Sequence, residues 1–403
     1  MTRRIVITGA GTINALGHDV PATVAAMQAG RCAIGDLALE DVARLSVRIG
    51  AQVRGYDPAA HFDRAQLTLY DRYTQFALLA AREAIGQSGL AFDDGRSDRT
   101  GVVLGTSGGG LGTQDDSYRA VYAAGKDRVH PFTVPRLMNS AAAAHISMGW
   151  GLTGPSFTVS TACASSNHAI AQAMGLIRAG LADVVVAGGA EAMLCFGGVK
   201  AWEGLRVMSR ETCRPFCATR TGMVQGEGAA VFVLEAAEHA AGRGAVALAE
   251  LAGCAMTSDA ADIVVPDRGG AARAMAGALR DAGLTPGDVG YVNAHGTATA
   301  ANDRTEAAAI ADVFDGSGAR PLVSSTKSMH GHCIGATGAI ELLACLSALR
   351  DGIVPPTANW RRADPDCPVE LVANEARAAR VDACLSNAFA FGGMNAVLAL
   401  RAA

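Results

Sequence analysis

The chain has 403 residues, of which 50% are hydrophobic and 18% are charged, and it contains 48 glycines. This composition excludes a disordered or fibrous chain and favours a large, deeply buried α/β protein. The net charge of −4, with no basic run, argues against nucleic acid as the principal partner, and ten scattered cysteines predict a reduced, cytoplasmic protein. We expect neither a signal peptide nor a membrane anchor, because the N-terminus runs directly into an apolar strand.

Strand and helix patterns alternate along the chain. In the first half, apolar runs predict strands at 4–8, 100–104, 157–161, 181–188 and 226–235, and helices are expected at 72–88, 165–178 and 237–242. In the second half, strands are expected at 248–253, 289–294, 322–325, 383–387 and 396–400, and helices at 270–283, 306–314 and 335–349. We therefore expect two similar α/β layers packed together, with a boundary near residues 240–250.

Two glycine-rich stretches follow predicted strands. We interpret Gly9-Ala-Gly11 as the opening of a loop, where a glycine turn after a strand raises the hypothesis of a dinucleotide site. The third glycine of that fingerprint is missing, so a nucleotide site is disfavoured. Residues 105–112 are predicted to form a flexible loop.

Cys163 lies in the longest charge-free run of the chain, residues 137–177. A strand pattern precedes it and a helix pattern follows it, so the thiol is placed at a helix N-terminus. Free N–H groups and the helix dipole favour a thiolate there, which is typical of a nucleophile. The alternative is a small buried hydrophobic residue, and the local pattern leaves both open.

Three other glycine-flanked segments place polar residues directly after predicted strands. They are Asn293-Ala-His-Gly-Thr-Ala-Thr299, Ser324-Ser-Thr-Lys-Ser-Met-His-Gly-His332 and Ser386-Asn-Ala-Phe-Ala-Phe-Gly-Gly-Met-Asn395. Loops at the carboxyl ends of strands converge at one edge of an α/β sheet, so these segments can meet Cys163 in one cleft. A thiol with two histidines and a lysine provides a nucleophile and donors for a developing oxyanion.

Each of these residues also has a structural interpretation. His295 alone is compatible with a hydrogen-bonded loop residue, and His332 strengthens the catalytic interpretation. The uncharged surroundings of Lys327 favour a buried ion pair, with Glu341 as its candidate partner. A zinc site is disfavoured, because its candidate ligands fit no common spacing; these are Cys213, Cys217, His330, His332 and Cys333.

The motifs around Cys163, His295, Lys327, His332 and Phe391 resemble, in order, those of β-ketoacyl-acyl-carrier-protein synthases. The match is closest to the synthase II group, and the stretch Ala201-Trp-Glu-Gly-Leu-Arg-Val-Met-Ser209 is similar to nodulation-type (NodE-like) members. The resemblance implies an α/β thiolase fold, with two pseudo-repeated halves in a five-layer sandwich. Residues 1–243 would carry the nucleophile, and residues 244–403 the histidines and the lysine.

The same resemblance implies the function. It is a decarboxylating Claisen condensation, in which an acyl group on Cys163 joins malonyl-acyl-carrier protein, in fatty acid or in specialised lipid or polyketide biosynthesis. The implied partner is an acyl carrier protein with phosphopantetheine-bound acyl and malonyl groups, and no cofactor or metal is implied. The implied assembly is a homodimer, or a heterodimer with a chain-length partner.

Residue roles follow by the same resemblance. His295 and His332 would stabilise the enolate, Lys327 and Glu341 would hold the histidines, and the N–H groups of Cys163 and Phe391 would form the oxyanion hole. Phe391 resembles a gate that opens on acylation. The substrate-binding candidates are Thr297 and Thr299 for the phosphopantetheine arm, Gly108, Phe196 and Phe389 for the pocket, and Arg64, Arg72, Arg206 and Arg210 for the carrier protein.

The chain departs from the family at three places. Arg214-Pro-Phe-Cys217 replaces the usual Arg-Pro-Phe-Asp, and His330 stands where the family has threonine, so the second histidine is taken as catalytic. Gly108 stands where synthase II members often carry a bulky aliphatic residue. Its small size predicts either a longer or wider tunnel that accepts long, rigid or polyunsaturated acyl chains, or only a more relaxed loop.

Two alternative functions are less consistent with the sequence. A non-catalytic chain-length subunit of a type II polyketide synthase typically lacks the active cysteine, which this chain has. A biosynthetic thiolase has a second reactive cysteine near the C-terminus, and the segment 386–395 has none.

Overall fold

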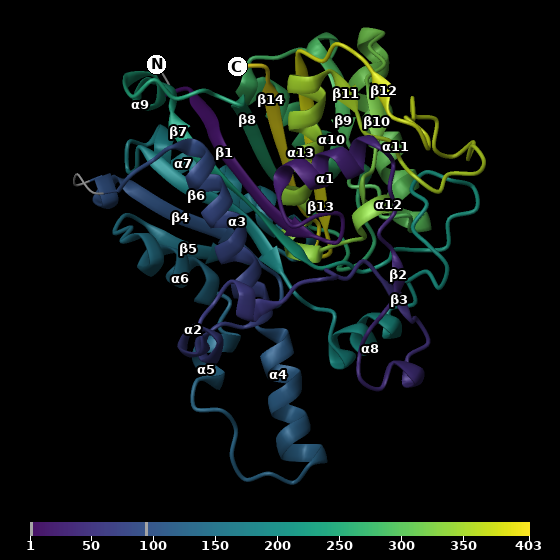
Figure 1. The fold of residues 1–403 in the computed structure, drawn as a ribbon. Helices are drawn as coiled ribbons and strands as arrows, with labels where there is room; N and C mark the ends of the chain where they lie inside the picture. The colour runs from purple at the N-terminus through teal and green to yellow at the C-terminus, as the bar shows by residue number, and fades with distance from the viewer. Residues whose placement is uncertain (1–2, 93–95) are drawn as a thin grey trace.

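The larger sheet has ten strands in the order β10-β9-β13-β14-β8-β1-β7-β6-β4-β5 (Figure 1). The computed structural model describes residues 3–92 and 96–403. The strands of this sheet are β1 (Ile5–Asn14), β4 (Thr100–Gly105), β5 (Ser156–Val159), β6 (Val184–Glu191), β7 (Gly228–Ala236), β8 (Ala249–Ser258), β9 (Val289–Asn293), β10 (Leu322–Ser324), β13 (Ala383–Ala390) and β14 (Met394–Arg401). Two short ribbons pair β2 (Gly35–Asp36) with β3 (Ile49–Gly50), and β11 (Ile353–Val354) with β12 (Arg377–Ala378).

The sheet consists of two halves with the same topology. Outward from the middle, β1-β7-β6-β4-β5 has antiparallel pairs between its first three strands and parallel pairs between its last three. The order β8-β14-β13-β9-β10 repeats this pattern strand by strand. Within the sheet, β1 and β8 connect the halves through two residue pairs, Val6 with Glu250 and Ile7 with Ala249. The expected duplication, which residue identity does not reveal, is therefore present as topology.

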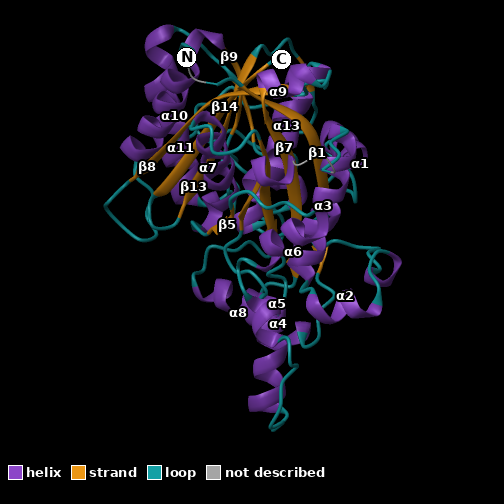
Figure 2. Ribbon diagram, turned by 90° about the vertical axis from the view of Figure 1, so that its left-hand side faces the viewer, coloured by secondary structure: helices purple, strands orange, loops and turns teal. Residues whose placement is uncertain are grey.

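Helices separate and cover the two half-sheets, which gives five layers (Figure 2). α3 packs on β1 and β7, α7 and α13 lie between the half-sheets, and α10 covers β8 and β14 with α11 beside it. The α-helices are α1 (Val20–Gln28), α2 (Arg64–Leu69), α3 (Arg72–Ser88), α4 (Leu111–Tyr118), α5 (Thr133–Leu137), α6 (Ala141–Trp150), α7 (Ser165–Arg178), α8 (Phe196–Gly204), α9 (Ala237–Gly242), α10 (Arg268–Ala282), α11 (Ala300–Phe314), α12 (Lys327–His330) and α13 (Thr337–Asp351). The predicted five-layer α/β sandwich is confirmed.

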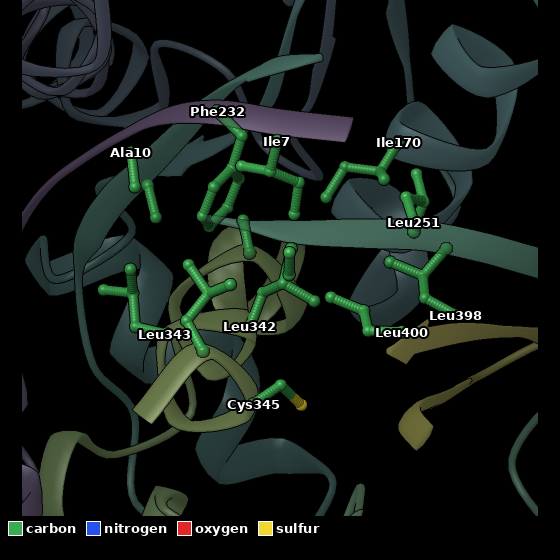
Figure 3. Packing of buried hydrophobic residues seen from close by; sticks show 14 of the residues in the cluster. Ile7, Ala10, Ile170, Phe232, Leu251, Leu342, Leu343, Cys345, Leu398 and Leu400 are labelled. Atoms are coloured by element: carbon green, nitrogen blue, oxygen red, sulfur yellow. The ribbon is translucent and has the colours of Figure 1, made fainter. Parts of the chain in front are cut away.

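The largest hydrophobic cluster fills the central layer. Ile170 of α7 and Leu342 of α13 pack with Ile7, Phe232 and Leu398 from both half-sheets (Figure 3). Separate clusters lie under α3 and under α10 with α11. α13 is buried over residues 337–348, whereas α7 exposes Gln172 and Gly175 on one face, so the turns that precede the two helices are anchored by their buried faces.

The interpretation of Gly9-Ala-Gly11 as a loop was wrong, because β1 continues through it to Asn14. A Cβ atom at Gly9 would lie 2.0 Å from the carbonyl oxygen of Ala84, and one at Gly11 would lie 2.0 Å from that of Ala80. The glycines therefore let α3 pack directly on the strand, which also leaves no room for a nucleotide phosphate.

Other departures concern the ends of elements. The predicted loop at 105–112 gives way at Leu111 to α4, which projects from the body in both views (Figures 1 and 2). The predicted strand at 383–387 extends to Ala390. The ten cysteines all lie within the described ranges, and each is a free thiol. In the described part of the chain, no helix has the length and apolarity needed to cross a bilayer.

Candidate active site

Cys163 is held in a tight turn between β5 and α7. The turn is a 3₁₀ segment, Ala162–Ala164, in which Ala162 has a φ of 47°, a left-handed value that is unusual for a residue with a side chain. The Ser165 hydroxyl accepts a hydrogen bond from the Thr161 N–H at 2.9 Å and donates one to the Ala162 carbonyl at 2.7 Å. These contacts hold the strained turn that presents Cys163 directly before the α7 N-terminus.

The structure brings Cys163, His295 and His332 together. One sulfur or ring nitrogen from each residue lies within 4.8 Å of the others, and all three side chains are buried. The two imidazole rings meet edge to face, with centroids 5.5 Å apart. These residues come from the turn before α7, the end of β9 and the turn before α13, so both halves of the sandwich contribute.

Threonine hydroxyls orient both histidines of the segment 324–332. His332 Nδ1 lies 2.8 Å from Thr337 Oγ1, and its Nε2 has no protein partner. His330 Nε2 lies 2.9 Å from Thr326 Oγ1, and His330 does not belong to the cluster around Cys163. The second histidine is thus the one whose free nitrogen is available at the site.

Buried charges surround the His295 loop. The Glu306 carboxylate accepts the N–H groups of His295 at 2.8 Å and of Gly296 at 2.7 Å. Lys327 Nζ lies 2.7 Å from Glu341 Oε1 and also donates to the His295 carbonyl. The predicted buried ion pair is confirmed, since both side chains are at most 1% exposed.

Burial keeps the reacting groups neutral. It raises the pKa of Cys163 to about 12, against the effects of Lys327 and of the N–H groups of Phe391 and Cys163, which lower it. Burial and the Lys327 charge hold the pKa of His295 and of His332 well below the ordinary value. The expectation that the helix N-terminus favours a thiolate is therefore outweighed by desolvation, and the resting site pairs a thiol with neutral imidazoles.

A pocket of about 610 Å³, partly open to solvent, leads to these groups. The predicted substrate-binding residues Thr297, Thr299 and Phe389 line it, and so does Phe391, the predicted oxyanion-hole residue and gate. The residues that the motifs did not reveal are Trp202, Val207, Met223, Val264, Pro266, Ala301, Asn302 and Ala390. Most of these are apolar and come from segments without a motif; Trp202 and Val207 fall in the stretch 201–209, and Ala390 falls in the segment 386–395.

Two predicted pocket residues do not line this pocket. Gly108 lies against Met193, whose Cε would be 3.2 Å from a Cβ atom at position 108. Phe196 begins α8, and its ring is covered by the guanidinium groups of Arg44 at 4.9 Å and Arg119 at 4.8 Å. Met193 and Phe196 pack against the hydrophobic cluster that contains Cys163, so they lie behind the nucleophile.

The structure also places the other candidates. Arg72 pairs with the buried Glu227 at 2.7 Å, and its side chain is 36% exposed. Arg64, Arg206 and Arg210 are exposed. Among the described residues, the group whose atoms could hold a metal ion is Cys163, His295 and His332, so the ligands considered for zinc do not form a cluster; they are Cys213, Cys217, His330, His332 and Cys333.

Comparisons with known proteins agree with this geometry. Residues 2–240 match the N-terminal domain of β-ketoacyl synthases, and residues 248–361 match their C-terminal domain. Nodulation protein E of Rhizobium sp. (strain N33) is 49% identical over 401 residues, which is 100% of both chains. The 3-oxoacyl-[acyl-carrier-protein] synthase 2 of Staphylococcus aureus (strain N315) is 37% identical over 406 residues, covering 99% of this chain and 98% of the relative.

Solved structures show the same likeness. The ishigamide ketosynthase/chain length factor superposes with a TM-score of 0.95 at 34% identity, over 100% of both chains. A type II polyketide ketosynthase in complex with its acyl-carrier protein, AntDE:AntF, superposes with a TM-score of 0.91 at 29% identity, again over 100% of both chains. Thus the similarity extends over the full length in sequence and in structure.

Proposed function

The chain belongs to the β-ketoacyl synthase family, and from this premise we propose how its own residues carry out the reaction. It is an enzyme, a ketosynthase that condenses an acyl group with a malonyl unit in fatty acid or polyketide synthesis. The cluster of Cys163, His295 and His332 at the base of the pocket carries the assignment of roles.

In the first half-reaction, Cys163 takes the acyl group. The sulfur attacks the thioester carbonyl, and the thiol proton passes by way of a neutral imidazole to the leaving pantetheine sulfur. The backbone N–H groups of Cys163 and Phe391 both lower the pKa of the Cys163 thiol, as donors close to the sulfur do. They are suited to serve as an oxyanion hole.

In the second half-reaction, the malonyl group loses carbon dioxide. The electron pair of the broken carbon–carbon bond forms an enolate, and the histidines donate hydrogen bonds to its oxygen. An imidazole with a lowered pKa is neutral at pH 7 and has one N–H to give, and Thr337 leaves Nε2 of His332 free for this purpose. The carbanion then attacks the acyl-Cys163 carbonyl and releases the thiolate.

Lys327 and Glu341 support the histidines without touching substrate. The ammonium group donates to the His295 carbonyl and lowers the pKa of both imidazoles. Glu341 partly compensates this charge at 2.7 Å. We assign them to positioning and to electrostatics.

The partner that delivers both groups is an acyl carrier protein, as in the solved complex of a related ketosynthase. Thr297 and Thr299, whose hydroxyls lie 2.9 Å apart at the pocket wall, would bind the phosphopantetheine arm. Arg206 and Arg210 are exposed on either side of the segment that contributes Val207 to the pocket, so they would meet the acidic carrier.

Gly108 and Met193 would form the wall of the acyl chamber behind Cys163. The space left by the missing side chain is occupied by Met193, an unbranched residue that adapts its shape. We therefore expect a tunnel whose wall adapts to the chain, rather than one that is permanently longer. Such a tunnel would accept long, rigid or polyunsaturated chains. If Gly108→Ile left the chain-length preference unchanged, this wall would play no part in selection.

The assembly would be a homodimer of chains with two halves, residues 1–243 and 244–403. Its support is the unpaired edge of β5 and the exposed apolar side chains beside it. A role as a chain-length subunit has no observation in its favour, because the nucleophile and both histidines are in place.

Incubation with malonyl-carrier protein and acyl-carrier primers of different lengths tests the function. Mass spectrometry should show acylation at Cys163, and a β-ketoacyl product should follow. Cys163→Ala should abolish both. Absence of acylation and of condensation with every primer would refute the proposal.

A further inference from the structure

Trp202 stacks on Phe391 inside the active-site pocket. The ring centroids are 5.9 Å apart and the planes are inclined by 25°. Both side chains line the pocket that leads to Cys163. Offset stacking of this kind contributes beyond simple burial, so it favours one position of Phe391 over others.

The Trp202 and Phe391 rings belong to segments that are anchored in different ways. Trp202 belongs to α8, which is tied down where the Glu203 carboxylate accepts the Val47 N–H at 2.8 Å and Lys200 Nζ donates to the Arg44 carbonyl at 2.8 Å. Phe391 is followed by Gly392 and Gly393, with φ values of 81° and 67°. Trp202 therefore sits on a helix anchored by side-chain contacts, whereas Phe391 precedes a turn held by backbone hydrogen bonds, in a left-handed conformation that glycine adopts readily.

Trp202 also connects this pocket with the interior behind Cys163. It packs against the hydrophobic cluster that contains Cys163, Leu194 and Val199. An acyl chain on Cys163 must displace part of this packing. An acyl chain that enters this region therefore disturbs the contact between Trp202 and Phe391.

We propose that Trp202 is a positioning residue that holds Phe391 closed while Cys163 is free, and that acylation of Cys163 breaks the stack. The stack then links occupancy of the acyl chamber to the admission of the malonyl group. This inference rests on the proposed function, because it requires acylation of Cys163. Its bonds are those of thioester exchange: the Cys163 sulfur bonds to the acyl carbon, the pantetheine sulfur leaves, and the proton moves to that sulfur.

Tryptophan fluorescence can report the stack directly, because the chain has three tryptophans. A variant with Trp150→Phe and Trp360→Phe keeps Trp202 as the only emitter, and neither replaced residue lines the pocket. With octanoyl-pantetheine as the probe, the emission should change at the rate at which mass spectrometry detects octanoyl-Cys163. The same variant with Cys163→Ala should show no change, and with Phe391→Ala it should show no further change on acylation.

The outcomes separate the two proposals. Acylation without a fluorescence change would overturn the role of Trp202 and leave the proposed function intact. No acylation by octanoyl-pantetheine or by octanoyl-carrier protein would overturn both.

A second measurement tests whether the Trp202–Phe391 stack couples acylation of Cys163 to decarboxylation of the malonyl group. In Trp202→Ala, decarboxylation of malonyl-carrier protein without a primer should rise about two- to tenfold relative to condensation, because an open gate no longer requires acylation. Trp202→Phe should restore the ratio, since it keeps an aromatic partner. An unchanged ratio of decarboxylation to condensation in Trp202→Ala would contradict the proposal. If Trp202→Ala does not fold, the fluorescence of the single-tryptophan variant tests the proposal instead.

Discussion

At the scale of single residues, the Thr337 hydroxyl determines which nitrogen of His332 faces the pocket. It lies 2.8 Å from Nδ1. Thr337→Val keeps the shape and removes this hydrogen bond, so the ring loses its fixed tautomer and orientation. We expect carbon dioxide release from malonyl-carrier protein to fall about 10- to 100-fold, while acylation of Cys163 changes little.

A matched control lies six residues before His332, at Thr326. Thr326 makes the same kind of bond, 2.9 Å long, to the histidine that stays outside the cluster. Thr326→Val should therefore affect decarboxylation far less than Thr337→Val. If each variant slowed acylation of Cys163 and decarboxylation to the same extent, the two hydroxyls would contribute only to stability.

Single residues also show what sequence can and cannot predict. Cys163, His295 and His332 were identified because each follows a predicted strand and is flanked by small residues. Trp202 and Thr337 belong to no such pattern, and their roles depend on contacts between distant segments. A helix N-terminus, which favours a thiolate, is visible in a sequence, whereas the complete burial that raises the pKa of Cys163 is not.

At the scale of elements, the close contact between α3 and β1 leads to a prediction about the free energy of unfolding. Gly9→Ala would place a methyl group 2.0 Å from the Ala84 carbonyl oxygen, which neither backbone can avoid without moving. We expect a loss of about 1–3 kcal/mol or more in the free energy of unfolding, measured by urea denaturation. A neutral result would contradict the packing described here.

Gly86 provides the control within the same helix. Nothing lies within 4 Å of a Cβ atom at this position of α3. Gly86→Ala should raise stability by about 0.5–1 kcal/mol, because alanine restricts the unfolded chain and favours helix. The opposite signs at Gly9 and Gly86 separate steric contact from backbone preference.

The start of β6 gives a prediction on pH. Asp183 accepts hydrogen bonds from Arg3 at 2.7 Å and from Arg99 at 3.0 Å, and these arginines, Arg99 first, lower its pKa to about 2. A pKa below the unfolded value of about 3.9 means that this contribution to stability is present above about pH 4 and is lost as the pH falls toward 2.

The urea midpoints of the wild type and Asp183→Asn should therefore differ equally at pH 7 and pH 5, and the difference should shrink by pH 3. Asp382→Asn is a suitable control, because its ion pair with Arg380 is almost fully solvated. A difference between wild type and Asp183→Asn that is independent of pH would exclude the ion pairs as its cause.

Elements were predicted well in their centres and poorly at their ends. Apolar alternation identifies the buried strands, but β13 and β1 both run on into glycine- or aromatic-rich stretches that resemble loops. The ladder partners β14 and β7 decide where these strands end, and such partners are remote in sequence. Likewise, the duplication is visible in the strand order of the two half-sheets. Different residues can form the same strand order, so comparing residue identities does not reveal it.

At the scale of the whole molecule, β5 leaves one edge of the ten-stranded sheet unpaired in the single chain. Phe157 on this strand is 37% exposed, and Met148 of the neighbouring α6 is 67% exposed. Apolar edge strands promote association with another chain, and a twofold axis would pair the β5 strands of two copies in a closed interface. This edge is therefore where we place the dimer contact.

Light scattering after size exclusion should give twice the chain mass for the wild type at micromolar concentration. Phe157→Asp places a charge at the proposed axis, where two like charges meet, so the measured mass should fall to that of one chain. Val246→Asp is the control, because this residue is 76% exposed but lies between α9 and β8, away from the edge. If Phe157→Asp stayed dimeric, or both variants dissociated alike, the β5 edge would not be the interface, and the exposed side chains of the α4 projection would become the next surface to test.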